Sequence, residues 1–304
     1  MKAIQFNEYG TADVLKITDT PRPILQSGQL LVQTKAFGVN PVDWKIRSGI
    51  LQNFIPLTLP HILGFELSGV VTEIAEDVQN FKVGDRIYSH TANAYAEYVL
   101  VQAEEAQIIP EFLNFEEAAS LPSNTQVAYS ALKIIGELQA NQKILILAGS
   151  GGVGVSAIQI AKSLGAFVAT TVSTKNIEMV KQLGADEVID YTTTDLSEIN
   201  TRFDLIIDLV GGHTQVEAWN LLTENGTLVS LTTDERQHIS NILDTQKFLY
   251  MSGPQNNPSK AVHELIASKK IKPVIDQVFK FDEIIQAHLK SETGHVAGKI
   301  VVTV

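Results

Sequence analysis

Hydrophobic residues follow two different rhythms along the chain. Up to about residue 120, short β-like runs such as 30–36 and 69–74 alternate with turns that contain Gly and Pro. Short strands between closely spaced turns are typical of a small β-rich, barrel-like unit. We therefore predict such a unit over residues 1–120.

From residue 121 to about 255, apolar strands alternate with helical segments. In residues 143–148, five apolar residues follow Lys143 without a break, which is typical of a strand buried on both faces of a parallel sheet. Further strand-like runs lie at 167–172, 187–190, 204–209 and 226–230. Alternation of strands and helices with right-handed crossovers builds a doubly wound sheet. The predicted fold class is therefore α/β, with a parallel-sheet domain after the β-rich one.

Residues 256–304 return to a mixed pattern. Two helices and a terminal strand are predicted there, at 259–268, 282–289 and 299–304. A segment of this size is too small to bury a core of its own. We expect it to complete the β-rich domain of residues 1–120, with residues 121–255 forming the second domain.

A glycine cluster follows the first buried strand of the second domain and precedes an apolar helix. Glycines let the backbone turn tightly and approach a pyrophosphate, and the N-terminus of a helix supplies free N–H groups and a positive dipole end. The alternative is a strand–helix turn that binds nothing. We predict a dinucleotide site formed by Gly149, Gly151, Gly152, Val153 and Gly154.

The residues after the second strand of this domain favour NADPH over NADH. Enzymes that use NADH usually carry Asp or Glu about 20 residues after the glycines, where it binds the ribose hydroxyls. Here the chain has Ser173, Thr174 and Lys175, with no carboxylate before Glu178. A hydroxyl and an ammonium suit a 2′-phosphate, so Ser173 and Lys175 are predicted to bind it. Lys175 is alternatively a solvated lysine at the start of a helix.

Charge and composition exclude several classes of function. The 304 residues include 23 Lys and Arg against 34 Asp and Glu, a net charge of −11, which gives no general attraction for nucleic acid or anionic membranes. The absence of cysteine excludes disulfides, thiolate zinc ligands and cysteine nucleophiles. Without a long apolar run or a signal-peptide pattern, we expect a cytoplasmic protein.

Several motifs, in order along the chain, resemble the medium-chain dehydrogenase/reductase superfamily, in particular its quinone oxidoreductase and enone reductase branch. They lie at 1–4, 38–43, 64–71, 83–87, 148–154, 183–186, 208–212 and 298–302. The likeness runs nearly from end to end. It implies a GroES-like catalytic domain, a Rossmann domain and, commonly, a homodimer.

The resemblance also implies that both metal sites of the zinc alcohol dehydrogenases are missing. Their cysteine ligand falls at Asn40 and their histidine ligand at Phe65, and neither side chain here replaces a thiolate or an imidazole on zinc. Zinc acts as a Lewis acid that lowers the pKa of an alcohol. Without it, hydride transfer from NADPH to an electron-poor acceptor is the easier reaction. The expected substrate is a quinone or an α,β-unsaturated carbonyl (enone).

The resemblance assigns catalytic residues and further cofactor contacts to this chain. Asn40 and Asp43 match positions near the cofactor, and Lys45 stands where enone reductases tend to carry lysine. The alternatives are a turn asparagine before Pro41, a carboxylate that only holds its loop, and an exposed lysine. Further cofactor contacts are expected from Tyr191, Gly211 and Ser252.

Two rival functions remain open. An enoyl-thioester reductase shares the fold but needs a basic entrance for the phosphate of coenzyme A or a carrier protein, and the acidic chain shows no obvious basic cluster. The other rival is a nucleotide-binding homologue with a structural or regulatory role. An intact glycine loop does not distinguish turnover from binding alone.

Overall fold

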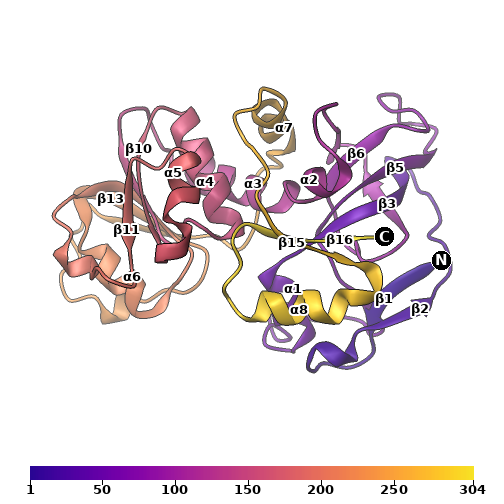
Figure 1. Ribbon diagram of the computed structural model, residues 1–304, viewed down its shortest axis with the longest axis horizontal. Coiled ribbons are helices and arrows are strands. Elements are labelled where there is room, and N and C mark those ends of the chain that lie inside the picture. The colour runs from indigo at the N-terminus through magenta and orange to yellow at the C-terminus, as the bar shows by residue number, and fades with distance from the viewer. The chain divides into compact units, whose positions relative to one another are not determined.

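A computed structural model describes all 304 residues of the chain. The chain divides into two compact units (Figure 1). Unit 1 comprises residues 1–123 and 273–304, and unit 2 comprises residues 124–272. Helix α7 (Ser259–Ala267) belongs to unit 2. The domain borders expected from the sequence, near 120 and 255, stay predictions about where independent folding units begin and end.

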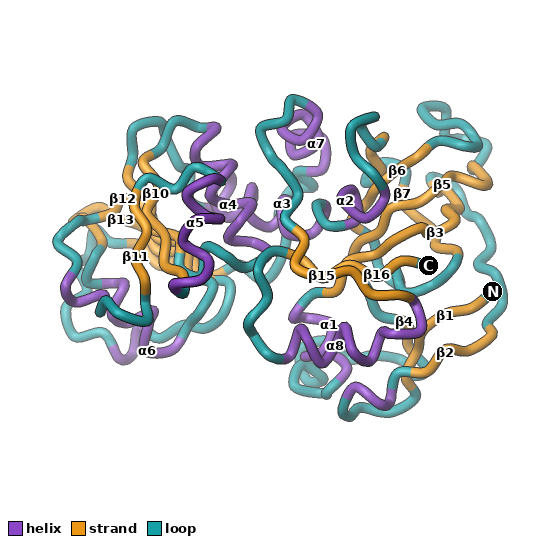
Figure 2. The backbone as a smooth tube through the Cα atoms, in the orientation of Figure 1, coloured by secondary structure: helices purple, strands orange, loops and turns teal.

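Unit 1 is built on a large sheet and a small one, drawn as orange segments in Figure 2. The large sheet has the order β15 (Ile275–Lys280), β16 (Lys299–Thr303), β3 (Gln29–Val39), β5 (Glu66–Ile74), β6 (Arg86–His90) and β8 (Ala106–Ile108), with β7 (Tyr98–Gln102) also paired to β3. The small sheet has the order β2 (Lys16–Asp19), β1 (Lys2–Phe6) and β4 (His61–Ile62). Within the large sheet only β15 and β16 run parallel. The C-terminal strand β16 therefore completes a sheet that the N-terminal segment begins.

Three helices accompany the sheets of unit 1, namely α1 (Pro41–Arg47), α2 (Phe115–Ala119) and α8 (Ile284–Glu292). Helix α1 begins at Pro41, one residue after β3, with Asn40 as its N-cap residue; proline is favoured at the first helical position because it has no N–H to leave unpaired. Apolar side chains of the strands, such as Phe37, Leu67 and Ile300, pack into one buried core. Because β3 and α1 are joined without a loop, this core also fixes the start of α1.

Unit 2 contains one sheet of six parallel strands. Their spatial order is β11 (Glu187–Asp190), β10 (Phe167–Val172), β9 (Lys143–Ile146), β12 (Phe203–Asp208), β13 (Leu222–Ser230) and β14 (Lys247–Tyr250). This is the Rossmann strand order, and the direction of the order reverses between β9 and β12. In such sheets ligands bind at the carboxyl ends of the strands beside this reversal. The architecture confirms the predicted α/β class.

Unit 2 has five α-helices. They are α3 (Pro122–Tyr129), which starts at the border of unit 1, α4 (Gly152–Ser163), α5 (Ile177–Gln182), α6 (Gly212–Trp219) and α7. Of these, α4, α5 and α6 connect consecutive strands of the sheet, while α3 precedes β9 and α7 follows β14. Strand β9 is buried, with Ile144, Leu145 and Ile146 fully inaccessible, as its continuous apolar sequence predicts. The buried β9 therefore fixes where the glycine loop that follows it begins.

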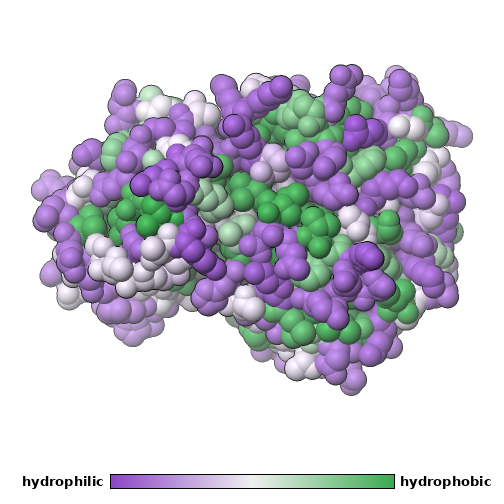
Figure 3. All heavy atoms as spheres, viewed as in Figure 1, coloured by the Kyte–Doolittle hydropathy of each residue, from purple (hydrophilic) through white to green (hydrophobic).

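The surface is mixed in character. Hydrophilic residues occupy much of the face in Figure 3, with hydrophobic residues between them. The most exposed large hydrophobic residues, Ile24, Phe54 and Val83, lie in loops and turns of unit 1. None of the helices has the length and apolar character that crossing a membrane requires.

Candidate active site

The glycine loop connects β9 to the N-terminus of α4. Gly151 is the N-cap residue of this 12-residue helix, no side chain caps it, and its first turn contains no acidic residue. The first N–H groups of a helix have no partner within the helix. The end of α4 therefore offers N–H donors and a positive dipole end to an anion.

Three glycines of this loop meet different steric demands. A Cβ on Gly154 would lie 2.4 Å from the carbonyl oxygen of Ala148, and a Cβ on Gly149 would lie 1.9 Å from Oγ1 of Thr170. Both glycines thus allow close packing of the loop. A Cβ on Gly151 would meet its nearest atom at 3.5 Å, so Gly151 faces open space. Close packing on one side and an open, uncapped helix end on the other fit the pyrophosphate of a dinucleotide.

The segment after β10 lies beside the glycine loop. The side-chain amide of Asn176 donates to Oγ of Ser150 at 3.0 Å and to Oγ of Ser173 at 3.3 Å. Lys175 is exposed, and so is Tyr191 at the end of β11. The structure thus brings the predicted Ser173 next to the predicted pyrophosphate site and leaves Lys175 accessible to a ligand.

A carboxylate also lies at this segment, and the sequence pattern does not predict it. Asp190 accepts hydrogen bonds from the hydroxyls of Thr174 and Thr192, each at 2.6 Å. These bonds, first that of Thr174, lower the pKa of Asp190, so it is charged at neutral pH. Because β10 and β11 pair in parallel, Asp190 lies opposite Val172, at the end of the second strand. Its charge opposes the attraction of Lys175 for a 2′-phosphate.

The loop after β12 is held by the buried Asp208. One carboxylate oxygen accepts from the N–H of Gly211 at 2.8 Å. The other accepts from the amide of Gln215 at 2.6 Å and the hydroxyl of Ser230 at 2.8 Å. Gly211 has a φ of 78°, and a Cβ on it would lie 2.7 Å from two threonine hydroxyls. Gly211 follows the carboxyl end of β12, which pairs in parallel with β9, so it lies at the same edge of the sheet as the glycine loop. Ser252 is exposed after β14.

In unit 1, Asn40 contacts a buried ion pair. Nζ of Lys299 donates to Oε1 of Glu66 at 2.6 Å and also to Oδ1 of Asn40. Nδ2 of Asn40 donates to the same Oε1 at 2.9 Å. Glu66 and Lys299 are buried, at 0 and 3 % exposure, and Asn40 is only partly buried. The sequence pattern only weakly indicates this ion pair, because Glu66 and Lys299 are each a single charged residue among apolar strand residues.

Asp43 belongs to a second buried chain of polar groups. Its Oδ2 accepts from the backbone N–H of Asn40 at 2.6 Å and from the hydroxyl of Tyr95 at 2.9 Å, while Oδ1 has no partner. The Tyr95 hydroxyl lies 3.3 Å from Nε2 of His288, whose Nδ1 lies 3.5 Å from Nη1 of Arg47. Burial raises the pKa of Asp43 to about 7, against the opposing effect of its two hydrogen bonds. Asp43 thus holds the start of α1.

The remaining residues singled out in this region have different surroundings. Lys45 lies on α1, partly exposed, with Nζ 5.8 Å from the centre of the Trp44 ring. Phe65, at the expected position of a zinc ligand, stacks on His90 with ring centres 6.4 Å apart. No group of three or more His, Cys, Asp or Glu side chains is arranged to hold a metal ion.

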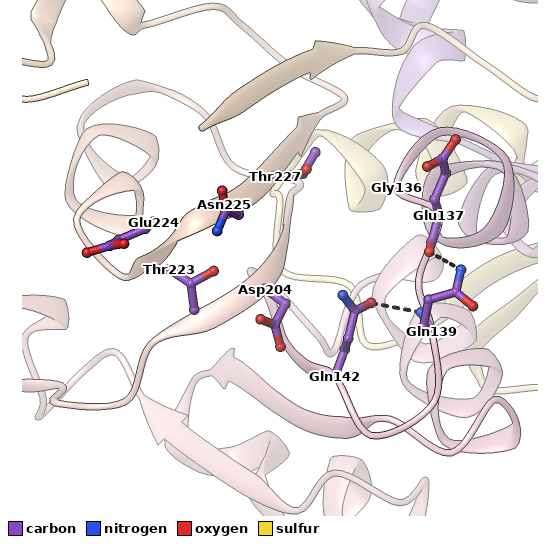
Figure 4. A pocket seen from close by; sticks show the side chains of 9 residues that line it. All are labelled: Gly136, Glu137, Gln139, Gln142, Asp204, Thr223, Glu224, Asn225 and Thr227. Carbon is purple, nitrogen blue, oxygen red and sulfur yellow. Dashed lines mark hydrogen bonds between the residues drawn. The ribbon is translucent and has the colours of Figure 1, made fainter. Parts of the chain in front are cut away.

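A separate hollow of about 620 Å³ lies elsewhere in unit 2 (Figure 4). Its lining includes Gln142, just before β9, and Asp204, near the start of β12, so it lies at the amino edge of the sheet. The carboxylates of Glu137, Asp204 and Glu224 line it as well. An acidic hollow at the edge opposite the glycine loop is unsuited to an anionic dinucleotide.

Unit 2 has a Rossmann sheet with a glycine loop, and unit 1 is GroES-like, with buried polar groups around Asn40 and Asp43. Together these features define a dinucleotide-dependent oxidoreductase. Comparisons with known families agree. The family described as "Alcohol dehydrogenase GroES-like domain" matches residues 26–111, and the family described as "Zinc-binding dehydrogenase" matches residues 183–302. The chain belongs to the medium-chain dehydrogenase/reductase superfamily, in its quinone oxidoreductase and enone reductase branch.

Individual relatives are similar over almost the whole chain. A 2-methylene-furan-3-one reductase of Solanum lycopersicum is 33 % identical, covering 99 % of this chain and 79 % of that protein. The chloroplastic NADPH-dependent alkenal/one oxidoreductase of Arabidopsis thaliana is 32 % identical with the same two coverages. The solved structure of the quinone oxidoreductase from Coxiella burnetii is 35 % identical, with a TM-score of 0.88, covering 100 % of this chain and 99 % of that one.

Proposed function

We propose that the protein is an NADPH-dependent reductase that transfers a hydride to a quinone or an enone without a metal ion. The observation that carries this proposal is the N-terminus of α4, which starts after the N-cap residue Gly151 and has no side-chain cap. The segment with Ser173 and Lys175 lies beside it, joined through the Asn176 amide. Relatives named as a 2-methylene-furan-3-one reductase, an NADPH-dependent alkenal/one oxidoreductase and a quinone oxidoreductase support the acceptor class.

The preference for NADPH rests on a balance of charges. Lys175 and the hydroxyl of Ser173 attract a 2′-phosphate, and exposed Tyr191 offers a further contact. The charged Asp190 acts against them, and its hydrogen bond with Thr174 turns it toward this segment. We propose that Lys175 outweighs Asp190, because the threonine hydroxyls already neutralise part of the negative potential of that carboxylate.

The chemistry requires stabilisation of a developing negative charge. When bound, NADPH supplies a hydride to the β-carbon of an enone or to a quinone, and charge develops on the carbonyl oxygen of the acceptor. One N–H of Asn40 is taken by Glu66, and the other is available to that oxygen. We assign the proton that completes the reduction to Lys45, which solvent then reprotonates. One hydride and one proton convert the acceptor to a saturated ketone or a hydroquinone.

The cofactor proposal is tested by fluorescence titration of the protein with NADPH and with NADH. We expect NADPH to bind at least tenfold more tightly, about 1.4 kcal/mol, and Lys175→Ala to lose this preference while still binding both nucleotides. Lys181→Ala, which removes a nearby lysine of α5 paired with Glu178, is the matched control and keeps the preference. Equal affinity of the wild type for NADH would mean that residues 173–175 do not bind a phosphate. Failure to bind either nucleotide would refute the reductase proposal.

A further inference from the structure

The amide of Asn40 has one electrostatically favourable orientation. Its oxygen faces the ammonium of Lys299, and its nitrogen donates to the carboxylate of Glu66. A flipped amide would place N–H groups against the ammonium and an oxygen against the carboxylate. Both contacts would then be repulsive, and they would be screened less than at the surface because the two charged groups are buried.

The ion pair is fixed by neighbouring strands of the large sheet. Lys299 is the first residue of β16 and Glu66 the first residue of β5, and both strands pair with β3. Gly38 of β3 leaves the space that Glu66 fills, since a Cβ there would lie 2.3 Å from Oε1. The other carboxylate oxygen accepts from the N–H of Ser123 at 2.8 Å. Glu66 is therefore held at both oxygens.

We propose that Lys299 and Glu66 are positioning residues that orient and polarise the Asn40 amide for the reacting carbonyl oxygen of the acceptor. This inference rests on the proposed function of Asn40. The ammonium draws electron density toward the amide oxygen, which makes the free N–H of Asn40 a stronger donor. Because the two charges balance each other, the amide is polarised without a net buried charge.

The variants remove the charges together, because removing one leaves the other buried and uncompensated. Glu66→Gln/Lys299→Met is made in the wild-type background and in Asn40→Ala. Lys290→Met/Asp276→Asn is the matched control, since it removes a 3.0 Å ion pair elsewhere in unit 1. For each protein we would measure the melting temperature, the Kd of NADPH, and kcat and KM with benzoquinone and with methyl vinyl ketone.

The inference predicts a coupled loss of turnover. In the wild-type background the Glu66→Gln/Lys299→Met double variant, here called the neutral pair, should lower kcat at least tenfold. Its melting temperature and its Kd for NADPH should stay close to wild type. In the Asn40→Ala background the same pair should change kcat less than twofold, because the residue it acts through is gone. The control pair should keep kcat within twofold.

Two results would overturn the inference while the wild type is active: an unchanged kcat for the neutral pair, or an equal loss in both backgrounds. If the neutral pair does not fold, Glu66→Gln/Lys299→Gln, which also removes both charges but keeps a polar side chain at each position, replaces it in the same cycle, with the same outcomes for and against. A wild type that oxidises NADPH with neither acceptor instead refutes the proposed function, so the two failures are distinguishable.

Discussion

Among single residues, Asp43 and His288 are buried groups for which burial favours the uncharged form. Burial raises the pKa of Asp43 to about 7 from its usual 3.8, and burial, followed by the charge of Arg47, lowers the pKa of His288 to about 3 from 6.5. The stability that Asp43 contributes is present below pH 3.8 and is lost as the pH rises through 7. The contribution of His288 is present above pH 6.5 and is lost as the pH falls toward 3.

These opposite slopes make Asp43→Asn informative. Asparagine keeps an acceptor for the N–H of Asn40 and the hydroxyl of Tyr95, and it puts its amide nitrogen where Oδ1 has no partner. We expect the variant to gain stability relative to wild type as the pH rises from about 4 to about 7, by up to about 4 kcal/mol. Thermal unfolding across this range checks it. A difference between the two proteins that does not change with pH would show that Asp43 is charged throughout.

Among the structural elements, the β9–α4 connection requires glycine for steric reasons that can be tested residue by residue. A Cβ on Gly154 would collide with the backbone of Ala148 and Gly149, which cannot move aside as a flexible side chain can. A Cβ on Gly151 has space, and Gly151 has a φ of −76° that alanine adopts without strain.

The two glycines therefore give a matched pair of variants. Gly154→Ala should lower the free energy of unfolding by about 1–3 kcal/mol, through overpacking. Gly151→Ala should leave the melting temperature unchanged and weaken NADPH binding about tenfold (about 1.4 kcal/mol), because its methyl group projects where a pyrophosphate would lie. Calorimetry and nucleotide titration of both proteins check this. Wild-type affinity in Gly151→Ala would place the pyrophosphate elsewhere.

Elements with a strong local signal could be predicted from the sequence. Strand β9 is a continuous apolar run and the glycine loop is contiguous, so both are predicted. Strands β14 and β15 are not predicted, because β14 has no fully buried residue and β15 exposes four of its six.

The same distinction applies to the candidate site. Ser173 and Lys175 follow from their spacing after the glycines. The contact of Glu66 with Lys299 joins residues 233 positions apart, and the approach of Asp190 to Thr174 depends on the parallel pairing of β10 and β11. Such contacts require the register of the sheet, which the pattern of single segments does not contain.

At the scale of the whole molecule, the net charge of −11 gives the protein no field that attracts an anionic cofactor. The proposed binding of NADPH therefore relies on local donors, namely the α4 N-terminus and Lys175. Membership of the superfamily accounts for both units, the GroES-like one and the Rossmann one. A homodimer and a cytoplasmic location stay predictions.

The most direct test of the account is stopped-flow oxidation of NADPH bound to the protein, after dialysis against a chelator. The mixing partners are benzoquinone, methyl vinyl ketone and crotonyl-coenzyme A, the last as a thioester probe. We expect rapid oxidation by benzoquinone or methyl vinyl ketone, slowed when the transferred hydrogen of NADPH is deuterium, and little oxidation by the thioester. Oxidation by the thioester alone would identify an enoyl-thioester reductase. Tight binding of NADPH without oxidation by any acceptor would contradict the account and indicate a nucleotide-binding protein without turnover.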